Sequence, residues 1–215
     1  FINKLRNDEI HGINVTVPFK NKVIKYLDKL SLEVESTDSV NTIYKSGKDI
    51  VGHNTDVAGF ELGLRHSKIN VLHKSILILG AGGVVPSIIY SLLSMGCKKI
   101  YLSNRTISKA EDIKNKFNEI EILKWGKIPD FDIVINATSV GLKGDSLDIE
   151  FNVKDKVFYD VIYNPKETHF LKKAKENGNK IENGKYMFIY QANQSFSIWN
   201  NVIPKIDKDV LKILE

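Results

Sequence analysis

The chain contains 215 residues, of which 42% are hydrophobic and 27% charged, so it is long enough to bury one large core or two smaller ones. Its 31 lysines and arginines outnumber its 26 aspartates and glutamates, but they are scattered along the sequence, which argues against a nucleic-acid-binding protein. The single cysteine excludes an intrachain disulfide, and the longest apolar stretch, residues 84–93, is too short to cross a membrane. We therefore expect a globular protein of the cytoplasm with no nucleic-acid or membrane partner.

The first third of the chain predicts short strands that alternate with short helices. The expected helices cover residues 1–9, 20–30 and 32–37, and the expected strands cover residues 13–17, 40–44 and 49–51. A longer helix is predicted to follow Asn54 and Thr55, whose side chains suit the N-cap, and Asp56 lies in its first turn. This pattern is typical of a small α/β domain.

Residues 14–20, Asn-Val-Thr-Val-Pro-Phe-Lys, are expected to place Lys20 just beyond the end of a strand. The β-branched residues favour an extended chain, Pro18 cannot continue the hydrogen-bonded ladder, and Phe19 is expected to anchor in apolar surroundings. Most lysines after strands are simply solvated, and Asp56 alone is an ordinary residue for a first helical turn. If both side chains face one cleft, they form a proton-transfer pair in which Lys20 exchanges the proton and Asp56 orients it.

From residue 75 the sequence predicts a parallel sheet. Four apolar runs without polar alternation lie at residues 75–79, 98–102, 131–135 and 157–162. Helical patterns separate these runs, including one at residues 107–117. Runs of this kind are typical of parallel strands that are covered on both faces.

The predicted fold class is α/β with two domains and a cleft between them. Residues 67–185 are expected to form a Rossmann-type dinucleotide-binding domain. Two amphipathic helices follow Gly184, the second at residues 207–214. We expect them to pack on the first part of the chain, so that residues 1–66 and 186–215 form a smaller α/β substrate domain.

A glycine-rich turn, Gly-Ala-Gly-Gly at residues 80–83, directly follows the first apolar strand and precedes a helix. Gly80 permits a tight turn, and Gly82 lets a pyrophosphate approach the helix N-terminus, where free N–H groups and the helix dipole favour an anion. Val85 replaces the third glycine of the dinucleotide-binding pattern. The alternative that the turn only connects strand and helix, without binding a nucleotide, therefore stays open. The position between strand and helix favours a nucleotide-binding site.

The residues after the next strand bear on the choice between NADP and NAD. Asn104, Arg105 and Thr106 stand where dinucleotide-binding folds place the group that contacts the adenine ribose, and no Asp or Glu is present there. A guanidinium pairs bidentately with a 2′-phosphate, whereas an acid accepts hydrogen bonds from a free 2′-hydroxyl. Arg105 therefore favours NADP. The alternative is a solvated arginine between two residues that cap the following helix.

Taken in order, these segments resemble the shikimate dehydrogenase family. The matching segments are Gly12 and residues 14–20, 40–42, 52–60, 80–83, 104–106, 136–141, 160–165 and 184–191. They span almost the whole chain. The segments around Lys20 and Asp56 are specific to the family, whereas the glycine turn is shared with many dinucleotide-dependent enzymes.

The resemblance implies an oxidoreductase that reversibly reduces 3-dehydroshikimate to shikimate with NADPH, a step of aromatic amino-acid biosynthesis. By position it implies Lys20 as the acid–base residue and Asp56 as its partner. The implied substrate-binding residues are Thr16, Asn41, Asp56, Tyr163 and Gln191. The implied cofactor-binding residues are Gly80, Ala81, Gly82, Gly83, Val84, Asn104, Arg105, Thr106, Thr138, Ser139, Val161 and Gly184. No metal is expected, because the five histidines and the cysteine lack ligand spacing, and a homodimer stays open.

Three features depart from the family pattern. That pattern begins with a strand and a helix carrying a Ser-x-Ser motif for the substrate carboxylate, and no such motif precedes Thr16, so we expect an N-terminal piece to be lacking. Pro86 replaces a basic or small residue, which the first turn of a helix tolerates. Asp38 and Ser39 replace a Gly-Ala pair before Asn41, which we expect to alter the turn alone.

Two alternatives to the implied function stay open. The first is an NAD-dependent enzyme that acts on quinate, and Arg105 argues against it because of its preference for a 2′-phosphate. The second is a catalytically silent NADP-binding homologue. The presence of both Lys20 and Asp56 argues against this second alternative.

Overall fold

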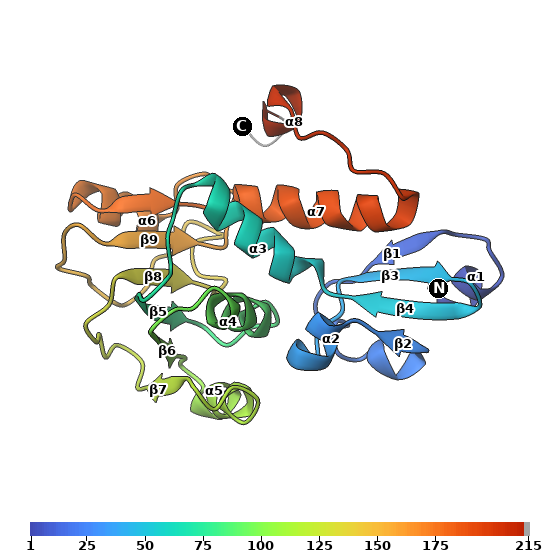
Figure 1. The fold of residues 1–215 in the computed structure, drawn as a ribbon. Helices are drawn as coiled ribbons and strands as arrows, with labels where there is room; N and C mark the ends of the chain where they lie inside the picture. The colour runs from blue at the N-terminus through green and yellow to red at the C-terminus, as the bar shows by residue number, and fades with distance from the viewer. Residues whose placement is uncertain (213–215) are drawn as a thin grey trace.

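Two β-sheets lie at opposite ends of the molecule in the computed structural model, which describes residues 1–212 (Figure 1). The strands of the smaller sheet are, in spatial order, β1 (Gly12–Asn14), β3 (Thr42–Ser46), β4 (Asp49–His53) and β2 (Lys29–Leu30). β3 pairs antiparallel with β1 and β4, and β2 lies parallel to β4. The buried residues packed together at this sheet are Leu5, Val34, Val40, Ile43 and Ile50.

All strand pairs of the larger sheet are parallel. Its strands are, in spatial order, β10 (Lys180–Glu182), β9 (Val157–Asp160), β8 (Ile133–Asn136), β5 (Ser75–Leu79), β6 (Lys99–Ser103) and β7 (Glu121–Leu123). The chain runs outward from β5 through β6 and β7, and then returns to the other side of β5 as β8. The strand order therefore reverses between β5 and β8, and open α/β sheets bind ligands beyond the carboxyl ends of the strands at such a point.

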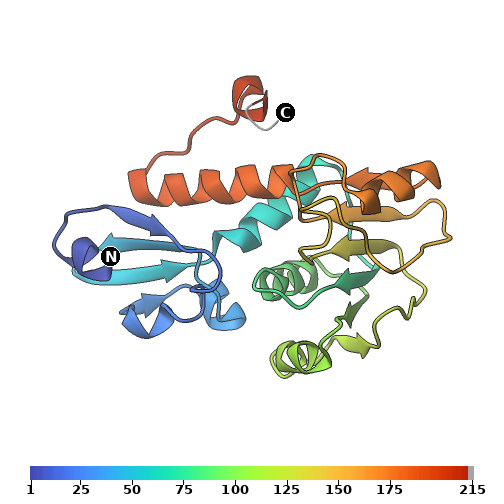
Figure 2. The ribbon, with the colours of Figure 1, turned by 180° about the vertical axis from the view of Figure 1, so that it is seen from behind.

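Helices join the strands within the larger sheet and also connect the two sheets. Successive strands of the larger sheet are joined by α4 (Val85–Ser94), α5 (Ile107–Lys114) and α6 (His169–Glu176). The smaller sheet is accompanied by α1 (Ile2–Arg6), the 3₁₀ helix η1 (Ile24–Tyr26) and α2 (Leu32–Thr37). In both views α3 (Thr55–His66) runs between the two sheets, and α7 (Lys185–Asn200) packs against it and extends over the smaller sheet (Figures 1 and 2). α8 (Lys208–Lys212) follows α7.

Two glycines on α3 allow α7 to approach closely. A Cβ atom on Gly59 would lie 2.7 Å from the Cβ atom of Gln191, and one on Gly63 would lie 3.0 Å from the backbone nitrogen of Met187. Any side chain at these positions would push the helices apart, because packed interiors leave no free space. The close crossing brings Gln191 beside the first half of α3.

The predicted parallel sheet is confirmed, with each of the four expected strands within two residues of its predicted ends. Two strands, β7 and β10, were not predicted; each has three residues and lies at an edge of the sheet. The helix expected at residues 207–214 corresponds to α8, and residues 213 and 214 lie outside the described part of the chain. Within residues 1–212, no helix is long and apolar enough to span a bilayer.

The strand predicted at residues 13–17 ends early. β1 stops at Asn14, and the chain turns between Thr16 and Phe19, where the Phe19 N–H donates to the Thr16 carbonyl at 2.9 Å. Phe19 does not anchor in apolar surroundings as expected, because 59% of its surface is exposed. The turn still delivers Lys20 to a point beyond the strand, as the prediction required.

The helix predicted at residues 20–30 is wrong. That stretch contains turns, the short helix η1 and the two-residue strand β2. Asp28 pairs with the neighbouring strand instead: its backbone N–H donates to the Ile50 carbonyl at 2.8 Å, and its carboxylate accepts from the Ile50 N–H at 2.8 Å. Contacts with β4 thus override a local helical spacing, which is only a weak preference.

Candidate active site

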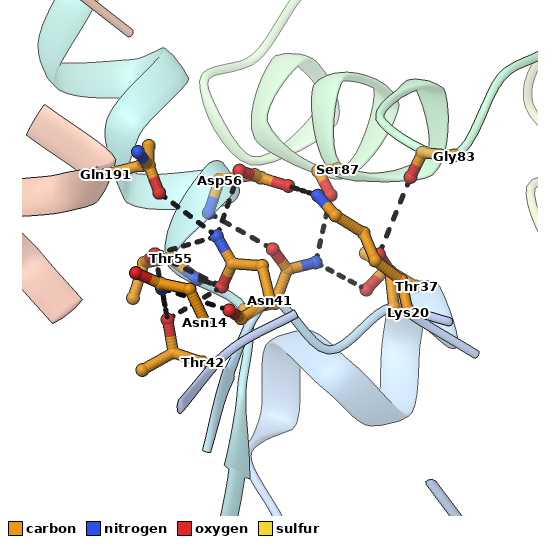
Figure 3. A network of polar contacts seen from close by, with 12 residues as sticks. Asn14, Lys20, Thr37, Asn41, Thr42, Thr55, Asp56, Gly83, Ser87 and Gln191 are labelled. Carbon is orange, nitrogen blue, oxygen red and sulfur yellow. Dashed lines mark hydrogen bonds and ion pairs between the residues drawn. The ribbon is translucent and has the colours of Figure 1, made fainter. Parts of the chain in front are cut away.

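Lys20 and Asp56 form an ion pair in which the ammonium donates to Oδ2 of the carboxylate (Figure 3). The backbone around Lys20 is held by the Val40 N–H, which donates to the Lys20 carbonyl at 2.9 Å. Asp56 lies in the first turn of α3, where the helix dipole favours a negative charge. Only 16% of the Lys20 side chain and 9% of the Asp56 side chain are exposed. The two residues that the sequence pointed to separately are therefore brought together.

Asn41 holds the other oxygen of this carboxylate. Its Nδ2 donates to Asp56 Oδ1 at 3.0 Å and to Thr55 Oγ1 at 2.9 Å, while its Oδ1 accepts from the Thr55 N–H at 2.8 Å. The same Nδ2 lies 3.4 Å from Oε1 of Gln191 on α7. Since Asn41 is buried, these bonds fix the carboxylate on one side while Lys20 pairs with it on the other.

A layer of buried hydroxyl groups lies beneath Asn41. Ser195 Oγ is 2.7 Å from Thr42 Oγ1 and 3.1 Å from Thr55 Oγ1, so one serine of α7 joins β3 and α3. Asn14 Nδ2 donates to Ser195 Oγ at 3.3 Å. None of these four residues was predicted as a site residue from the sequence. The available signal was spacing, because Ser195 follows Gln191 by one helical turn and Thr42 follows Asn41 directly.

The glycine turn lies at the carboxyl end of β5. Gly80 has a φ of +106°, its N–H donates to the Ser103 carbonyl at 2.8 Å, and a Cβ atom there would lie 2.8 Å from the Ala137 carbonyl oxygen. Gly82 and Gly83 are exposed, and a Cβ atom on either would meet its nearest neighbour only at 3.8 Å. Gly80 is thus required by the backbone, whereas the next two glycines leave open space above the start of α4.

A cavity of about 350 Å³ is lined by both the glycine turn and Lys20 of the ion pair. One side is lined by Val17, Lys20 and Ser39, and the opposite side by Gly82 and Gly83. The Ser39 hydroxyl donates to the Gly83 carbonyl at 3.5 Å across this space. Lys20 and the phosphate-binding type of turn therefore line the same space.

The expected 2′-phosphate site lies beside this turn. β6 pairs with β5 in a register that places Ser103 opposite Leu79, so Asn104, Arg105 and Thr106 follow at the same edge of the sheet. Asn104 Nδ2 donates to the Thr106 carbonyl at 2.7 Å, and Arg105 is exposed. Thr106 occupies the N-cap position of α5 without a side-chain cap hydrogen bond, so an ordinary capping role does not account for it.

The loops after β8 and β9 are joined by a buried carboxylate. Asn136 Nδ2 donates to both oxygens of Asp160 at 3.1 Å, and Asn136 Oδ1 accepts from the backbone and hydroxyl of Thr138. Asp160 also accepts from Thr168 Oγ1 at 2.6 Å and from the Ile162 N–H at 3.0 Å. Burial raises the pKa of Asp160 to about 6. These bonds place Thr138 and its neighbour Ser139 at the edge that also carries the glycine turn.

Three further predicted residues, Gly184, Tyr163 and Thr16, lie around this site in different surroundings. A Cβ atom on Gly184 would lie 2.0 Å from the Val161 carbonyl oxygen, so only glycine fits there. Tyr163 stacks on Phe188 of α7 with ring centroids 4.6 Å apart, one turn before Gln191. Thr16 is exposed in the turn that precedes Lys20. Hydrogen bonds thus connect Lys20 and Gln191 with the central residues, whereas Thr16 and Tyr163 lie outside that network.

A parallel sheet with a glycine turn at its switch point, facing a lysine–aspartate pair across one cavity, defines the class of dinucleotide-dependent oxidoreductases. Two family models match the chain: "Shikimate dehydrogenase substrate binding domain" over residues 1–43, and "Shikimate / quinate 5-dehydrogenase" over residues 63–142. The chain therefore belongs to the shikimate dehydrogenase family.

Similar proteins support the same assignment. A shikimate dehydrogenase (NADP(+)) of Pelagibacter ubique is 54% identical over 214 residues, which cover 98% of this chain and 81% of the relative. The crystal structure of shikimate dehydrogenase from Aquifex aeolicus is 36% identical with a TM-score of 0.86, covering 99% of this chain and 79% of that one. The shikimate 5-dehydrogenase of Thermus thermophilus, solved with NADP(H) and shikimate, is 27% identical with a TM-score of 0.87, covering 100% and 82%.

Proposed function

We propose that Lys20 and Asp56 carry the proton transfer of an NADP-dependent shikimate dehydrogenase. The chain is an oxidoreductase that reversibly reduces 3-dehydroshikimate to shikimate with NADPH, a step of aromatic amino-acid biosynthesis. The observation that carries the residue assignment is the shared cavity: Lys20 borders it from one side, and Gly82 and Gly83 border it from the other. A nucleotide held at the turn and a small acid held at the lysine would meet in that space.

On the substrate side, the ammonium of Lys20 donates a proton to the oxygen that gains negative charge during reduction, and takes it back in the reverse direction. The Asp56 carboxylate keeps this ammonium oriented, because it pairs with Nζ through Oδ2 while Asn41 holds Oδ1. Asn41 and Gln191 offer amide donors and acceptors to the hydroxyl groups of the substrate. Thr16 and Tyr163 complete the proposed substrate-binding set from the turn before Lys20 and the loop after β9.

On the nucleotide side, the residues of the glycine turn fit a pyrophosphate, because Gly82 and Gly83 leave the approach to the start of α4 open. NADPH supplies the hydride. The proposed cofactor-binding residues belong to the turn, to the loop after β6, to the loops after β8 and β9, and to the N-cap of α7. They are Gly80, Ala81, Gly82, Gly83, Val84, Asn104, Arg105, Thr106, Thr138, Ser139, Val161 and Gly184. The exposed guanidinium of Arg105 supports its pairing with the 2′-phosphate.

The two sheets support a division into a dinucleotide-binding domain at residues 67–185 and a substrate domain formed by residues 1–66 and 186–215, of which the structure describes all but the last three. The intact lysine–aspartate pair speaks against a catalytically silent homologue, and Arg105 speaks against an NAD-dependent quinate enzyme. A homodimer stays a prediction, and light scattering of the purified chain tests it.

Steady-state kinetics with shikimate and NADP⁺ test the proposal. We expect Lys20→Ala to lower kcat by about 10²-fold or more, with a smaller change in substrate affinity, since positioned acid–base groups contribute on that scale. Lys22→Ala is the matched control, because Lys22 is an exposed lysine two residues further along the same turn. Lys20→Ala rates equal to those of the control would remove Lys20 from the mechanism.

A further inference from the structure

A buried asparagine connects the aspartate of the proton-transfer pair to the helix that follows the glycine turn. We infer that Asn54 is a positioning residue that fixes Asp56 relative to α4, and so sets the separation between the lysine–aspartate pair and the nucleotide-binding turn. The inference deepens the proposed function and rests on it for the roles of Asp56 and of the turn.

The hydrogen bonds of Asn54 use both ends of its amide. It is fully buried and caps α3, with Oδ1 accepting from the Asp56 N–H at 3.1 Å. Its Nδ2 donates to Thr37 Oγ1 on α2 and to Ser87 Oγ on α4, both at 2.9 Å. Each of the two amide protons thus goes to a different helix. One side chain therefore joins three helices at the base of Asp56.

The contact with Ser87 reaches the nucleotide side of the cavity. Ser87 is fully buried in the first turn of α4, and α4 begins at Val85, directly after the glycine turn. One turn further along, the Ser91 hydroxyl donates to the Val57 carbonyl at 3.0 Å, so α4 has a second polar contact with α3 that does not involve Asn54. Both serines bring a hydroxyl group to the contact between α4 and the first turn of α3. Ser87 accepts from Asn54, which caps that turn, whereas Ser91 donates to the Val57 carbonyl and has no bond to the cap.

Directional bonds at this place matter for hydride transfer. The reacting atoms must be held about 3–3.5 Å apart, and an error of about 1 Å can cost about 10²-fold in rate. Apolar contacts between helices permit the helices to slide past each other. A buried amide that loses one partner is instead left with an unpaired donor, which lowers the free energy of unfolding. Asn54 therefore opposes any displacement of α4 relative to the first turn of α3.

Ser87→Ala and Ser91→Ala form a matched pair for the test, since both remove one hydroxyl from a buried position of α4. We expect Ser87→Ala to lower kcat roughly tenfold or more, with KM for shikimate and Kd for NADPH within about twofold of wild type. In the reduction of 3-dehydroshikimate, the primary isotope effect on kcat from deuterated NADPH should rise, because the hydride step becomes slower. We expect Ser91→Ala to keep kcat and the isotope effect at wild-type values. Equal effects of the two variants would overturn the inference.

A double-mutant cycle keeps the test independent of turnover. Asn54→Ser keeps an oxygen that caps Asp56 but is too short to reach Ser87, so we expect it to lower the free energy of unfolding and kcat. Adding Ser87→Ala to Asn54→Ser should cause little further loss in either quantity, because Asn54→Ser has already removed the bond to Ser87. Additive losses of unfolding free energy would overturn the inference whatever the activity. Absence of shikimate oxidation by the wild-type chain would instead refute the proposed function, and the unfolding cycle would still decide whether Asn54 couples α4 to the first turn of α3.

Discussion

The two ends of the proposed site are built in different ways. At the substrate end, Lys20, Asn41 and Asp56 come from three elements and hold one another through buried side-chain hydrogen bonds. At the nucleotide end, an exposed backbone turn and an exposed Arg105 offer their groups to solvent. A small polyhydroxylated acid requires preformed side-chain donors and acceptors at fixed positions, whereas phosphates require free N–H groups and positive charge, which a turn supplies locally. The contrast predicts that substitutions at the substrate end act on turnover and those at the nucleotide end on cofactor affinity.

The largest effect is expected at the substrate end, from Asp56→Asn. This change preserves the size of the side chain but removes the charge that orients the Lys20 ammonium, so we expect kcat to fall by about 10²-fold while Kd for NADP⁺ stays near wild type. Asp49→Asn is a suitable control, because Asp49 pairs with Lys29 far from the cavity, and 67% of that lysine is exposed. If the loss appeared mainly as weaker NADP⁺ binding, the proposed separation of the two ends would be wrong.

At the nucleotide end, Arg105→Ala should separate the two cofactors. Hydrogen bonds to charged groups contribute about 1.5–3 kcal/mol, so we expect KM for NADP⁺ to rise by about tenfold to 10²-fold and KM for NAD⁺ to stay unchanged. Arg65→Ala, which removes an arginine paired with Glu61 on α3, should affect neither. Equal loss with both dinucleotides would show that Arg105 does not contact the 2′-phosphate.

The nucleotide end could be predicted from the sequence more completely than the substrate end. The glycine turn and Arg105 are local patterns placed by one strand each, so they could be predicted with their positions in the sheet. The pairing of Lys20 with Asp56 depends on contact between two segments that are distant in the sequence. The sequence alone predicted this pair only if both side chains faced one cleft, and the family resemblance supplied the rest. Ser87 gave no signal, because a buried serine that bonds to another element looks like any other serine in a helix, and the only signal for Ser195 was its spacing of one helical turn from Gln191. The false helix at residues 20–30 has the same cause, since contacts of Asp28 with β4 are invisible to local spacing.

A smaller effect is expected within the glycine turn, where two neighbours have different tasks. Gly80→Ala places a side chain at a φ of +106° and against the Ala137 carbonyl, so we expect a loss of stability of about 1–3 kcal/mol. Gly82→Ala meets nothing closer than 3.8 Å and should leave the unfolding free energy near wild type while weakening NADP⁺ binding. Chemical unfolding and calorimetric titration of both variants check this. Intact binding in Gly82→Ala would contradict the assignment of the open turn to the pyrophosphate.

The last prediction concerns stability and the one buried carboxylate that joins the loops of the nucleotide end. Burial raises the pKa of Asp160 to about 6, although hydrogen bonds from Thr168, the Ile162 N–H and Asn136 act in the opposite direction. Because this folded-state pKa lies above the unfolded value of about 3.9, the folded protein holds the proton more tightly between about pH 4 and pH 6. The stabilising contribution is therefore present at low pH and is lost as the pH rises through about 6.

Asp160→Asn removes this titration, so the difference in unfolding free energy between wild type and variant should change by up to about 3 kcal/mol between pH 4 and pH 7, to the disadvantage of wild type at the higher pH. Asp132→Asn is the opposite control: the Ser75 N–H, which donates to Asp132 at 2.9 Å, lowers the pKa of that carboxyl, so its contribution is lost as the pH falls. Urea unfolding of the three proteins at both pH values measures the slopes. A difference between wild type and Asp160→Asn that does not vary with pH would mean that Asp160 keeps its ordinary pKa, and that its hydrogen bonds offset the effect of its burial.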